Sequence, residues 1–350
     1  MSLPQKAMKN CFIYGTRPEL IKMYPVIKRT EDKYVICTGQ HRDLIDKDLL
    51  TPDRNLNLMK RKQNLNSLVN LLLVHLSWAI EYAKPERIIV QGDTATAFVG
   101  AMLAFHNGIQ LAHIEAGLRT WDKTQPFPEE IYRRFISSVT DIHFCPTWDN
   151  YRNIEIITKY TAHIAGFVPG NTVVDAIEEF APEVTYDNTF LVTLHRRESD
   201  WEDYGRALLR VAHNYPDYTL KVLIHPNAVG QGLKRVLGYG GTLPNIQLLD
   251  PLSYTDFLKE LASCYIIITD SGGLQEEAPC LNKPVVIMRK ITERLENLGR
   301  GATLARTGED VEKAVDRLVN DEKYYADMAD AKNPFGDGDA GRRIAEVLNK

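Results

Sequence analysis

The stretch Cys11-Phe-Ile-Tyr-Gly-Thr-Arg-Pro-Glu-Leu-Ile-Lys22 joins a short apolar run to a glycine and then to a segment with helical spacing. The apolar run predicts a buried strand, Gly15 permits a tight turn, and Pro18 suits the first position of a helix. A second stretch, Ile266-Ile-Ile-Thr-Asp-Ser-Gly-Gly-Leu-Gln-Glu-Glu277, repeats this order of strand, glycine turn and helix start. One such unit in each half of the chain indicates an α/β protein.

Short apolar runs of this kind recur along the chain and are typical of buried strands in a parallel sheet. Segments with helical spacing lie between them at 64–82, 94–105, 148–159 and 254–262. This alternation is typical of doubly wound sheets, so we expect two α/β domains. The strand pattern pauses within 166–185, where we place the hinge. The nine expected strands are 11–14, 34–37, 87–90, 111–114, 142–144, 190–193, 220–224, 265–269 and 284–288.

Length and composition agree with a globular protein of the cytoplasm. The 350 residues correspond to two domains at roughly 150 residues each. No run approaches the roughly 20 apolar residues that cross a membrane, and the polar segment 1–10 does not resemble a signal peptide. Five scattered cysteines without a Cys-x-x-Cys pair predict neither a disulfide framework nor a zinc site. No His/Cys cluster has metal-ligand spacing, so we expect no metal.

The charge balance restricts the kind of partner. A formal net charge of −4 offers no broad basic field for nucleic acid, so an anionic ligand must meet a local cluster of Arg and Lys. Arg17 and Lys22 flank the N-terminus of the first predicted helix, where N–H groups and partial positive charge favour a phosphate. A plain strand-to-helix turn is the alternative interpretation of this segment.

The glycine turn of the second half is a more specific signal. Ser271 and the backbone of Gly272 and Gly273 can approach a pyrophosphate closely, because glycine has no side chain in the way. Glu277, one helical turn further on, is suited to accept hydrogen bonds from a ribose diol. A residue that complements the helix dipole is the alternative, and that role would suffice for Glu276.

Three acidic residues of the first half are candidates for acid–base chemistry. Asp93 and Glu115 follow predicted strands directly, and Glu129 lies in Pro126-Phe-Pro-Glu-Glu130. Taken alone, Asp93 also suits a helix N-cap and Glu129 a helix-dipole role. Glu115 is harder to explain in that way, because a carboxylate directly after an apolar strand needs a partner if it is buried. Together, the three are suited to move a carbon-bound proton.

Cations follow two strands of the second half. His195 ends the strand at 190–193 beside Arg196 and Arg197, where it can face a leaving phosphate. A solvated run of surface charges is the alternative. Arg294 follows another strand and is open to the same two interpretations.

Nine motifs cover nearly the whole chain in order: Gly15-Thr-Arg-Pro-Glu-Leu-Ile-Lys22, Gly39-Gln-His-Arg42, Gly92-Asp-Thr94, His113-Ile-Glu-Ala-Gly-Leu-Arg-Thr120, Pro128-Glu-Glu130, Gly170-Asn-Thr-Val-Val-Asp175, His195-Arg-Arg-Glu198, Asp270-Ser-Gly-Gly-Leu-Gln-Glu-Glu-Ala-Pro279 and Asn333-Pro-Phe-Gly-Asp-Gly338. In this order they resemble the non-hydrolysing UDP-N-acetylglucosamine 2-epimerases. The resemblance implies two Rossmann-like domains that face each other across a cleft, as in glycosyltransferase-B enzymes. Residues 1–168 with a C-terminal helix at 336–350 would form the first domain, and 169–335 the second.

The resemblance also implies the chemistry. UDP leaves while the C2 proton is removed, a 2-acetamidoglucal stays bound, and UDP then re-adds to give UDP-N-acetylmannosamine. No carbonyl group acidifies that proton, so the departing anion must drive the elimination and cations must stabilise it. UDP-N-acetylglucosamine and UDP are the implied ligands, a homodimer is usual, and no cofactor is implied.

Site residues carry over from the family position by position. The implied catalytic residues are Asp93, Glu115, Glu129 and His195. The implied UDP- and substrate-binding residues are Arg17, Lys22, His225, Phe257 beside the uracil, Ser271, Gly272, Gly273, Gln275, Glu277 and Arg294.

Several positions depart from the family pattern. Thr292-Glu-Arg-Leu-Glu296 replaces Thr-Glu-Arg-Pro-Glu, and His225-Pro-Asn227 replaces His-x-Asn-Pro, without loss of a charged role. Asp43 and Lys62 differ from the residues common in bacterial relatives. These two positions adjoin a second, activating substrate site, for which the candidate residues are Gln40, His41 and Arg196.

Other functions within this architecture remain alternatives. Hydrolysing relatives, which release free N-acetylmannosamine, typically depart from Gly-Thr-Arg-Pro-Glu, which this chain retains. A UDP-sugar glycosyltransferase would not need the three carboxylates, and a non-catalytic sensor would lose them. An epimerase of an oxidised or diacetamido UDP-sugar stays open, because no residue identified here reports on C3 or C6.

Overall fold

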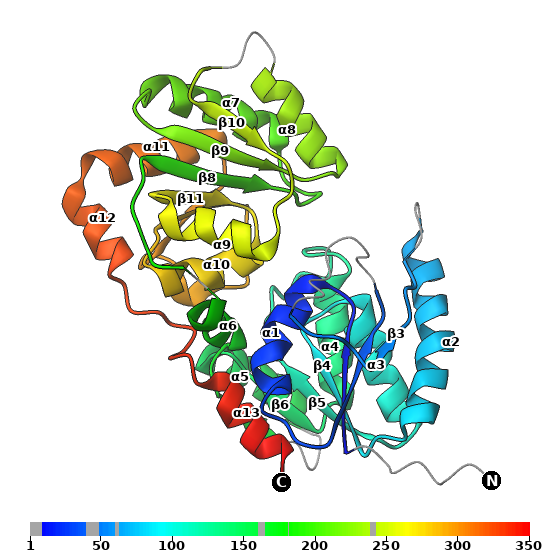
Figure 1. Ribbon diagram of the computed structural model, residues 1–350. Coiled ribbons are helices and arrows are strands. Elements are labelled where there is room, and N and C mark those ends of the chain that lie inside the picture. The colour runs from blue at the N-terminus through cyan, green and yellow to red at the C-terminus, as the bar shows by residue number, and fades with distance from the viewer. Residues whose placement is uncertain (1–8, 40–48, 60–62, 160–164, 181, 239–242) are drawn as a thin grey trace. The chain divides into compact units, whose positions relative to one another are not determined.

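A computed structural model describes residues 9–39, 49–59, 63–159, 165–180, 182–238 and 243–350. The chain divides into two compact units, Met1–Ala176 with Phe335–Lys350 and Ile177–Pro334, and each holds one parallel sheet with helices on its faces (Figure 1). The predicted fold class of two doubly wound α/β domains is confirmed. Some residues of the expected second substrate site lie outside the described residues, namely Gln40, His41, Asp43 and Lys62.

The first unit is built on a seven-stranded sheet of order β3-β2-β1-β4-β5-β6-β7. The order reverses between β1 and β4, and such a switch point is where ligands bind in doubly wound sheets. The carboxyl ends of β1, β4 and β5 therefore lie side by side. The strands are β1 (Asn10–Tyr14), β2 (Lys33–Cys37), β3 (Arg54–Asn55), β4 (Arg87–Gln91), β5 (Gln110–Ile114), β6 (Ile142–Phe144) and β7 (Ala165–Phe167).

Side chains that alternate along these strands fill two apolar cores, one on each face of the sheet. On β1, Cys11 and Ile13 join the core beneath α2, α3 and α4, while Phe12 and Tyr14 join the core beneath α1 and α13. The C-terminal helix α13 lies beside α1 (Figure 1). The helices of this unit are α1 (Arg17–Ile27), α2 (Leu65–Ala83), α3 (Ala95–His106), α4 (Glu129–Val139), α5 (Trp148–Thr158), α6 (Thr172–Phe180), in which the boundary between the units falls, and α13 (Ala340–Leu348).

The second unit repeats the design with a six-stranded sheet of order β10-β9-β8-β11-β12-β13. Its switch point lies between β8 and β11, which pair in parallel. Its elements are β8 (Thr189–Leu194), α7 (Trp201–Asn214), β9 (Thr219–Ile224), α8 (Ala228–Gly238), β10 (Ile246–Leu249), α9 (Tyr254–Ser263), β11 (Ile266–Thr269), α10 (Gly272–Glu277), the 3-10 turn η1 (Ala278–Leu281), β12 (Val285–Met288), the 3-10 turn η2 (Leu295–Asn297), β13 (Ala302–Ala305), α11 (Gly308–Asn320) and α12 (Glu322–Ala329).

All nine expected strands and the four expected helices are present. The sequence patterns did not reveal β3, β7, β10 and β13, which have two to four residues each. Within the part of the chain that the structure describes, no helix is both long and apolar enough to span a membrane.

Candidate functional site

The turn between β1 and α1 is organised by Glu19. Its buried carboxylate accepts hydrogen bonds from the backbone N–H of Gly15 at 3.0 Å and of Thr16 at 2.8 Å, and Thr94 Oγ1 donates to it at 2.7 Å. Burial raises the pKa of Glu19 to about 7, although these hydrogen bonds oppose the shift. Two backbone donors of the expected phosphate turn are thus bonded to Glu19, while Arg17 lies half-buried at the start of α1.

Glu115 follows β5 directly and lies in a buried polar cluster. Lys22 Nζ donates to Glu115 Oε1 at 2.8 Å, and Gln91 Nε2 donates to Oε2. Gln91 reaches Glu115 because it ends the neighbouring strand β4, where it is paired with Ile114. Lys22, expected beside a phosphate, therefore also neutralises the carboxylate that follows the apolar strand.

Asp93 follows β4 and lies near Glu115. The N-cap interpretation of Asp93 is wrong, because Thr94 caps α3 and accepts the N–H of Ala97 at 3.1 Å. The Asp93 carboxylate instead contacts Arg133 of α4, with 2.7 Å between Nε and Oδ2. A Cβ atom built on Gly92 would lie 3.7 Å from Glu115 Oε2, so the two strand ends bring their acidic residues close together.

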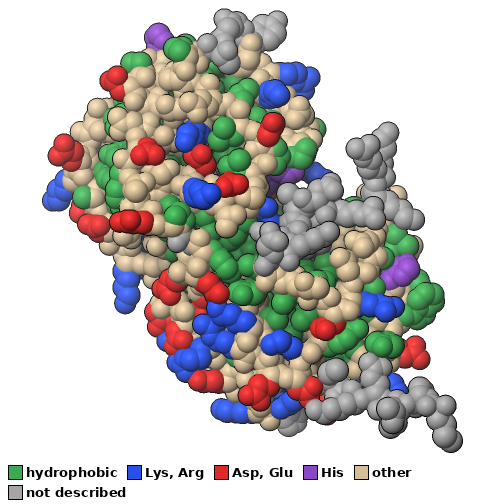
Figure 2. Space-filling model, in the orientation of Figure 1, with side chains coloured by type: hydrophobic (Ala, Val, Ile, Leu, Met, Phe, Trp, Pro, Cys, Tyr) green, Lys and Arg blue, Asp and Glu red, His purple; other side chains and the backbone are tan. Residues whose placement is uncertain are grey.

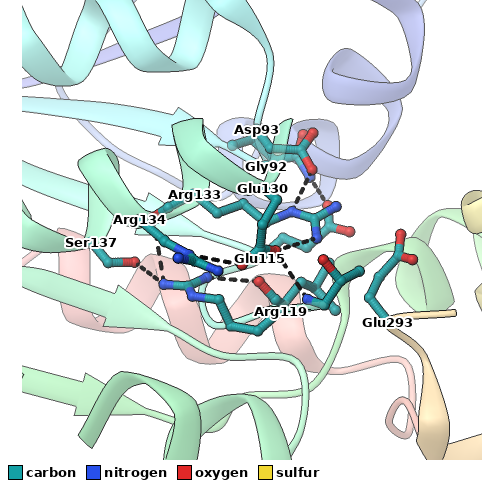
Figure 3. Close-up of polar contacts among 12 residues, drawn as sticks. Gly92, Asp93, Glu115, Arg119, Glu130, Arg133, Arg134, Ser137 and Glu293 are labelled. Atoms are coloured by element: carbon teal, nitrogen blue, oxygen red, sulfur yellow. Dashed lines mark hydrogen bonds and ion pairs between the residues drawn. The ribbon is translucent and has the colours of Figure 1, made fainter. Parts of the chain in front are cut away.

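The first turn of α4 carries two glutamates with different surroundings, of which Figure 3 labels Glu130. Glu129 begins the helix and is half-buried. Glu130 is fully buried, and its carboxylate accepts the backbone N–H groups of Thr120 at 3.0 Å and Trp121 at 3.2 Å. Arg134 Nε also donates to Glu130, at 3.0 Å. Glu130 thus fixes the β5–α4 loop, whereas Glu129 is the more accessible of the two.

In the second unit, the ends of β11, β8 and β9 place Asp270, His195 and His225 in a row. Asp270 is fully buried and accepts the backbone N–H of His195 and Arg196. Its Oδ1 lies 3.1 Å from His195 Nδ1, and the rings of His195 and His225 have centroids 5.6 Å apart. Burial lowers the pKa of His195, and the charge of Asp270 opposes that shift. Arg196 also donates to the Asp270 carbonyl, at 3.0 Å.

The glycine turn after β11 brings Arg294 close to α10. Ser271 caps this helix, and a Cβ atom on Gly272 would lie 2.7 Å from Arg294 Nη1, so a side chain does not fit there. Arg294 Nε donates to Glu276 at 2.7 Å, and its Nη1 contacts Glu293. Arg294 is therefore held by two buried carboxylates, and a dipole role is not sufficient to explain Glu276.

The remaining candidates of the second unit lie around this turn or on α9. Gln275 donates from Nε2 to the Ser271 carbonyl at 3.1 Å and accepts from Thr292 Oγ1 at 2.7 Å. Gly273 and Glu277 follow on α10, with Glu277 half-buried, and Phe257 is half-buried on α9. Within the described ranges, no group of three or more His, Cys, Asp or Glu side chains has the arrangement of a metal site.

Several polar residues of these clusters were not predicted from the sequence. Arg133 and Glu130 hold Asp93 and the loop after Glu115, and Asp270 and Glu276 hold His195 and Arg294. The spacing of Glu130 and Arg133 within one helical turn was an available signal, since such neighbours face each other. The partners in the second unit lie in segments far apart in the sequence, which only the tertiary fold brings together.

Comparisons with known proteins identify the family of the chain. A family profile described as UDP-N-acetylglucosamine 2-epimerase matches residues 26–349. The chain is 37% identical over 367 residues to the UDP-N-acetylglucosamine 2-epimerase of Bacillus subtilis strain 168, covering 98% of this chain and 95% of that protein.

Solved structures give the same result. The structure is similar to that of UDP-GlcNAc 2-epimerase from Neisseria meningitidis bound to UDP-GlcNAc, with a TM-score of 0.89, 33% identity, and coverage of 97% of this chain and 99% of that chain. It is also similar to the Methanocaldococcus jannaschii enzyme in complex with UDP-GlcNAc and UDP, with a TM-score of 0.84, 31% identity, and coverage of 97% and 99%. The chain therefore belongs to the UDP-N-acetylglucosamine 2-epimerase family.

Proposed function

We propose that this protein interconverts UDP-N-acetylglucosamine and UDP-N-acetylmannosamine without net hydrolysis. The observation that carries the proposal is the clustering of Asp93 and Glu115 at the ends of two neighbouring strands, each with its own cation. Arg133 contacts Asp93 at 2.7 Å and Lys22 contacts Glu115 at 2.8 Å. Two carboxylates at the ends of neighbouring strands are suited to take and return a proton at a single carbon.

The chemistry follows from the weak acidity of that carbon. A carboxylate removes the C2 proton, the C1–O bond to the UDP β-phosphate breaks, and the electron pair of the C–H bond forms a C1=C2 double bond. In the return step, a UDP oxygen attacks C1 while an acid delivers a proton to the opposite face of C2. Asp93, Glu115 and Glu129 are our candidates for acid and base, and both steps leave the redox state of the sugar unchanged.

Cations must stabilise the phosphate charge that develops as UDP leaves. Our candidates are Arg17 and Lys22 of the first unit and His195 and Arg294 of the second. Lys22 and Arg294 are already oriented by the carboxylates that hold them. Preorganised donors need little rearrangement as the charge appears, which favours the transition state.

The nucleotide is proposed to bind through the second unit. Ser271, Gly272 and Gly273 present backbone and hydroxyl donors to the pyrophosphate. Glu277, half-buried one turn later, would bind the ribose diol, and the uracil would contact Phe257 on α9. Gln275 would support the turn through its bond to Ser271. His225 and Arg196 are further candidates for contacts to phosphate, with Arg196 assigned to the second substrate site.

The non-hydrolysing outcome is supported by the first turn. Hydrolysing relatives depart from Gly15-Thr-Arg-Pro-Glu19, whereas here Glu19 ties that turn to Thr94 beside Asp93. A turn fixed in this way would help to keep water away from a glycal bound beside Asp93 until UDP re-adds.

Proton NMR of the protein with UDP-N-acetylglucosamine in deuterated buffer tests the proposal. We expect UDP-N-acetylmannosamine with deuterium at C2 and no build-up of free sugar. Accumulation of UDP with free N-acetylmannosamine would assign the protein to the hydrolysing class. Absence of C2 exchange, in a protein that still binds UDP, would indicate a different UDP-sugar substrate or a binding role.

We also propose that the protein works as a homodimer in the cytoplasm. Val74, Trp78 and Tyr82 recur every four residues along α2 and are 50%, 65% and 54% exposed. Neighbouring helices add Phe105 on α3 and Phe135 on α4, which are also exposed. Figure 2 shows hydrophobic side chains on the surface where Figure 1 places α2. An apolar row of this kind is typical of a protein interface.

The cytoplasmic location is supported by the cysteines. Cys11 and Cys37 are buried and form no disulfide, which suits a reducing compartment.

A further inference from the structure

The side chain of Arg133 extends from α4 toward the carboxylate of Asp93 (Figure 3). Its Nε is 2.7 Å from Asp93 Oδ2, and the Arg133 side chain is only 5% exposed, against 26% for Asp93. Asp93 can therefore reach a ligand, whereas Arg133 is covered. The contact with Asp93 gives Arg133 a route by which it can act on the reaction without touching a ligand.

The guanidinium of Arg133 is oriented by a residue of the same helix. Glu130, one turn earlier and fully buried, lies 3.6 Å from Arg133 Nη1. The same carboxylate binds the backbone of Thr120 and Trp121 in the loop that follows Glu115. The first turn of α4 therefore joins Asp93 to the loop of the neighbouring strand through two buried, charged side chains.

The backbone before Asp93 is fixed from the side of β5. Gly92 has a φ of +66°, a conformation that glycine adopts readily. His113 Nε2 lies 2.7 Å from the Gly92 carbonyl oxygen, which can only accept, so Nε2 carries the proton. Burial lowers the pKa of His113 to about 4, so its ring stays neutral at physiological pH. The position of Asp93 is thus determined at both its main chain and its side chain.

We propose that Arg133 is a positioning residue for the proton-transfer carboxylate Asp93, holding its Oδ2 so that the carboxylate keeps one fixed direction. The inference rests on the proposed function, because it assigns Asp93 to one face of the sugar C2 carbon. The planar guanidinium fixes direction better than an ammonium group, which is a rotatable point charge. Small displacements of a catalytic group cost large factors in rate, so a hidden arginine can control kcat without contact to substrate.

The test compares Arg133→Gln and Arg133→Lys with the control Arg134→Gln. Arg134 is the next residue on the same helix and also pairs with Glu130, but its side chain is 34% exposed and, within the described ranges, it forms no ion pair with Asp93. The readouts are kcat, KM and the primary isotope effect with substrate deuterated at C2, measured separately from each of the two epimers.

We expect Arg133→Gln to lower kcat by about 100-fold with KM within about threefold, because orientation and not binding is lost. Arg133→Lys should recover part of the loss. The isotope effect should rise for the one epimer whose proton Asp93 removes and should not rise for the other. Arg134→Gln should stay within about threefold of the wild type in kcat, with unchanged isotope effects.

Equal losses in the two glutamine variants, or isotope effects that rise for both epimers, would overturn the inference, as would an unchanged kcat in Arg133→Gln. If Arg133→Gln does not fold, the isotope effects of Arg133→Lys against Arg134→Lys decide the question, since both retain the charge. A wild-type protein that does not exchange the C2 proton defeats the proposed function instead. If the wild-type protein exchanges the C2 proton but the Arg133 variants behave like the Arg134 control, only the proposed role of Arg133 is wrong.

Discussion

Lys22 and Glu115 form an ion pair inside the first unit, with 2.8 Å between Nζ and Oε1 and side chains that are 8% and 6% exposed. The pair joins the first turns of α1 to the end of β5, across a separation of 93 residues in the sequence. Gln91 completes the carboxylate's hydrogen bonding from β4. Two buried charges that satisfy each other in this way are costly to separate.

Removal of one partner should therefore destabilise the protein more than removal of both charges. Lys22→Met leaves the Glu115 charge buried without its cation, and we expect the free energy of unfolding to fall by about 3 kcal/mol. The double variant Lys22→Met with Glu115→Gln should recover most of that loss, yet show no C2 proton exchange. Urea unfolding and NMR exchange measure the two properties. A double variant no more stable than Lys22→Met would contradict the coupling.

Glu19 should stabilise the folded protein more at low pH than at neutral pH, which is the opposite of the usual effect of a carboxylate. Its pKa is raised to about 7 in the folded protein by burial, against about 4.3 in an unfolded chain. Between these two pH values the folded state binds the Glu19 proton more tightly than the unfolded chain does. The contribution of Glu19 to the free energy of unfolding is therefore present at low pH and is lost as pH rises from about 4.5 to 7.

The variant Glu19→Gln carries no titratable group at this position and can still bond Thr16 and Thr94. Relative to wild type, it should gain about 3 kcal/mol of unfolding free energy between pH 4.5 and pH 7.5. Urea unfolding of both proteins over this range provides the difference curve. A flat curve would show that burial does not shift the titration of Glu19.

Gly341 marks the place where the C-terminal helix approaches α1. A Cβ atom on Gly341 would lie 2.7 Å from Pro25 Cβ and 2.9 Å from its carbonyl oxygen. Gly341→Ala should therefore displace α13 and lower the free energy of unfolding by about 1–3 kcal/mol. Gly238→Ala is the matched control, because no atom of the described residues lies within 4 Å of a Cβ atom there. Thermal unfolding should show the control at or above the wild-type midpoint, whereas equal losses would exclude a steric cause.

The homodimer proposal predicts a specific sensitivity of α2. Trp78→Glu places a charge in the exposed apolar row and should weaken self-association at least about tenfold. Trp148→Glu is the control, since Trp148 is similarly exposed, at 66%, but lies on α5. Sedimentation equilibrium of the three proteins measures the dissociation constants. Equal dissociation constants for the wild type and both variants would show that α2 does not form the dimer interface.

Local sequence patterns predicted most of the framework. Apolar runs of three to five residues identified nine strands, and the glycine turns after β1 and β11 identified a strand–turn–helix unit in each half of the chain. These signals are local, because a period of two or a residue free to turn depends only on near neighbours in the chain. The motif order was also sufficient to indicate the family, which the comparisons confirm.

Partners within the candidate site were harder to predict. Asp93 by itself suited a helix N-cap, but the cap is Thr94 and the carboxylate contacts Arg133. Of the two neighbouring glutamates on α4, the sequence singled out Glu129, whereas Glu130 makes the buried contacts. A one-residue change of position on a helix turns a side chain by about 100°, and only packing decides which of two neighbours faces inward.

The sequence by itself determined the strands, the turns and the chemical types of residue available at their ends. Tertiary structure alone decided which of those residues meet. Strand order places β1, β4 and β5 side by side, and this brings Lys22 to Glu115 and Arg133 to Asp93. The physical reason is that a charge–charge contact depends on distance in space, which is set by sheet topology and packing and not by spacing along the chain.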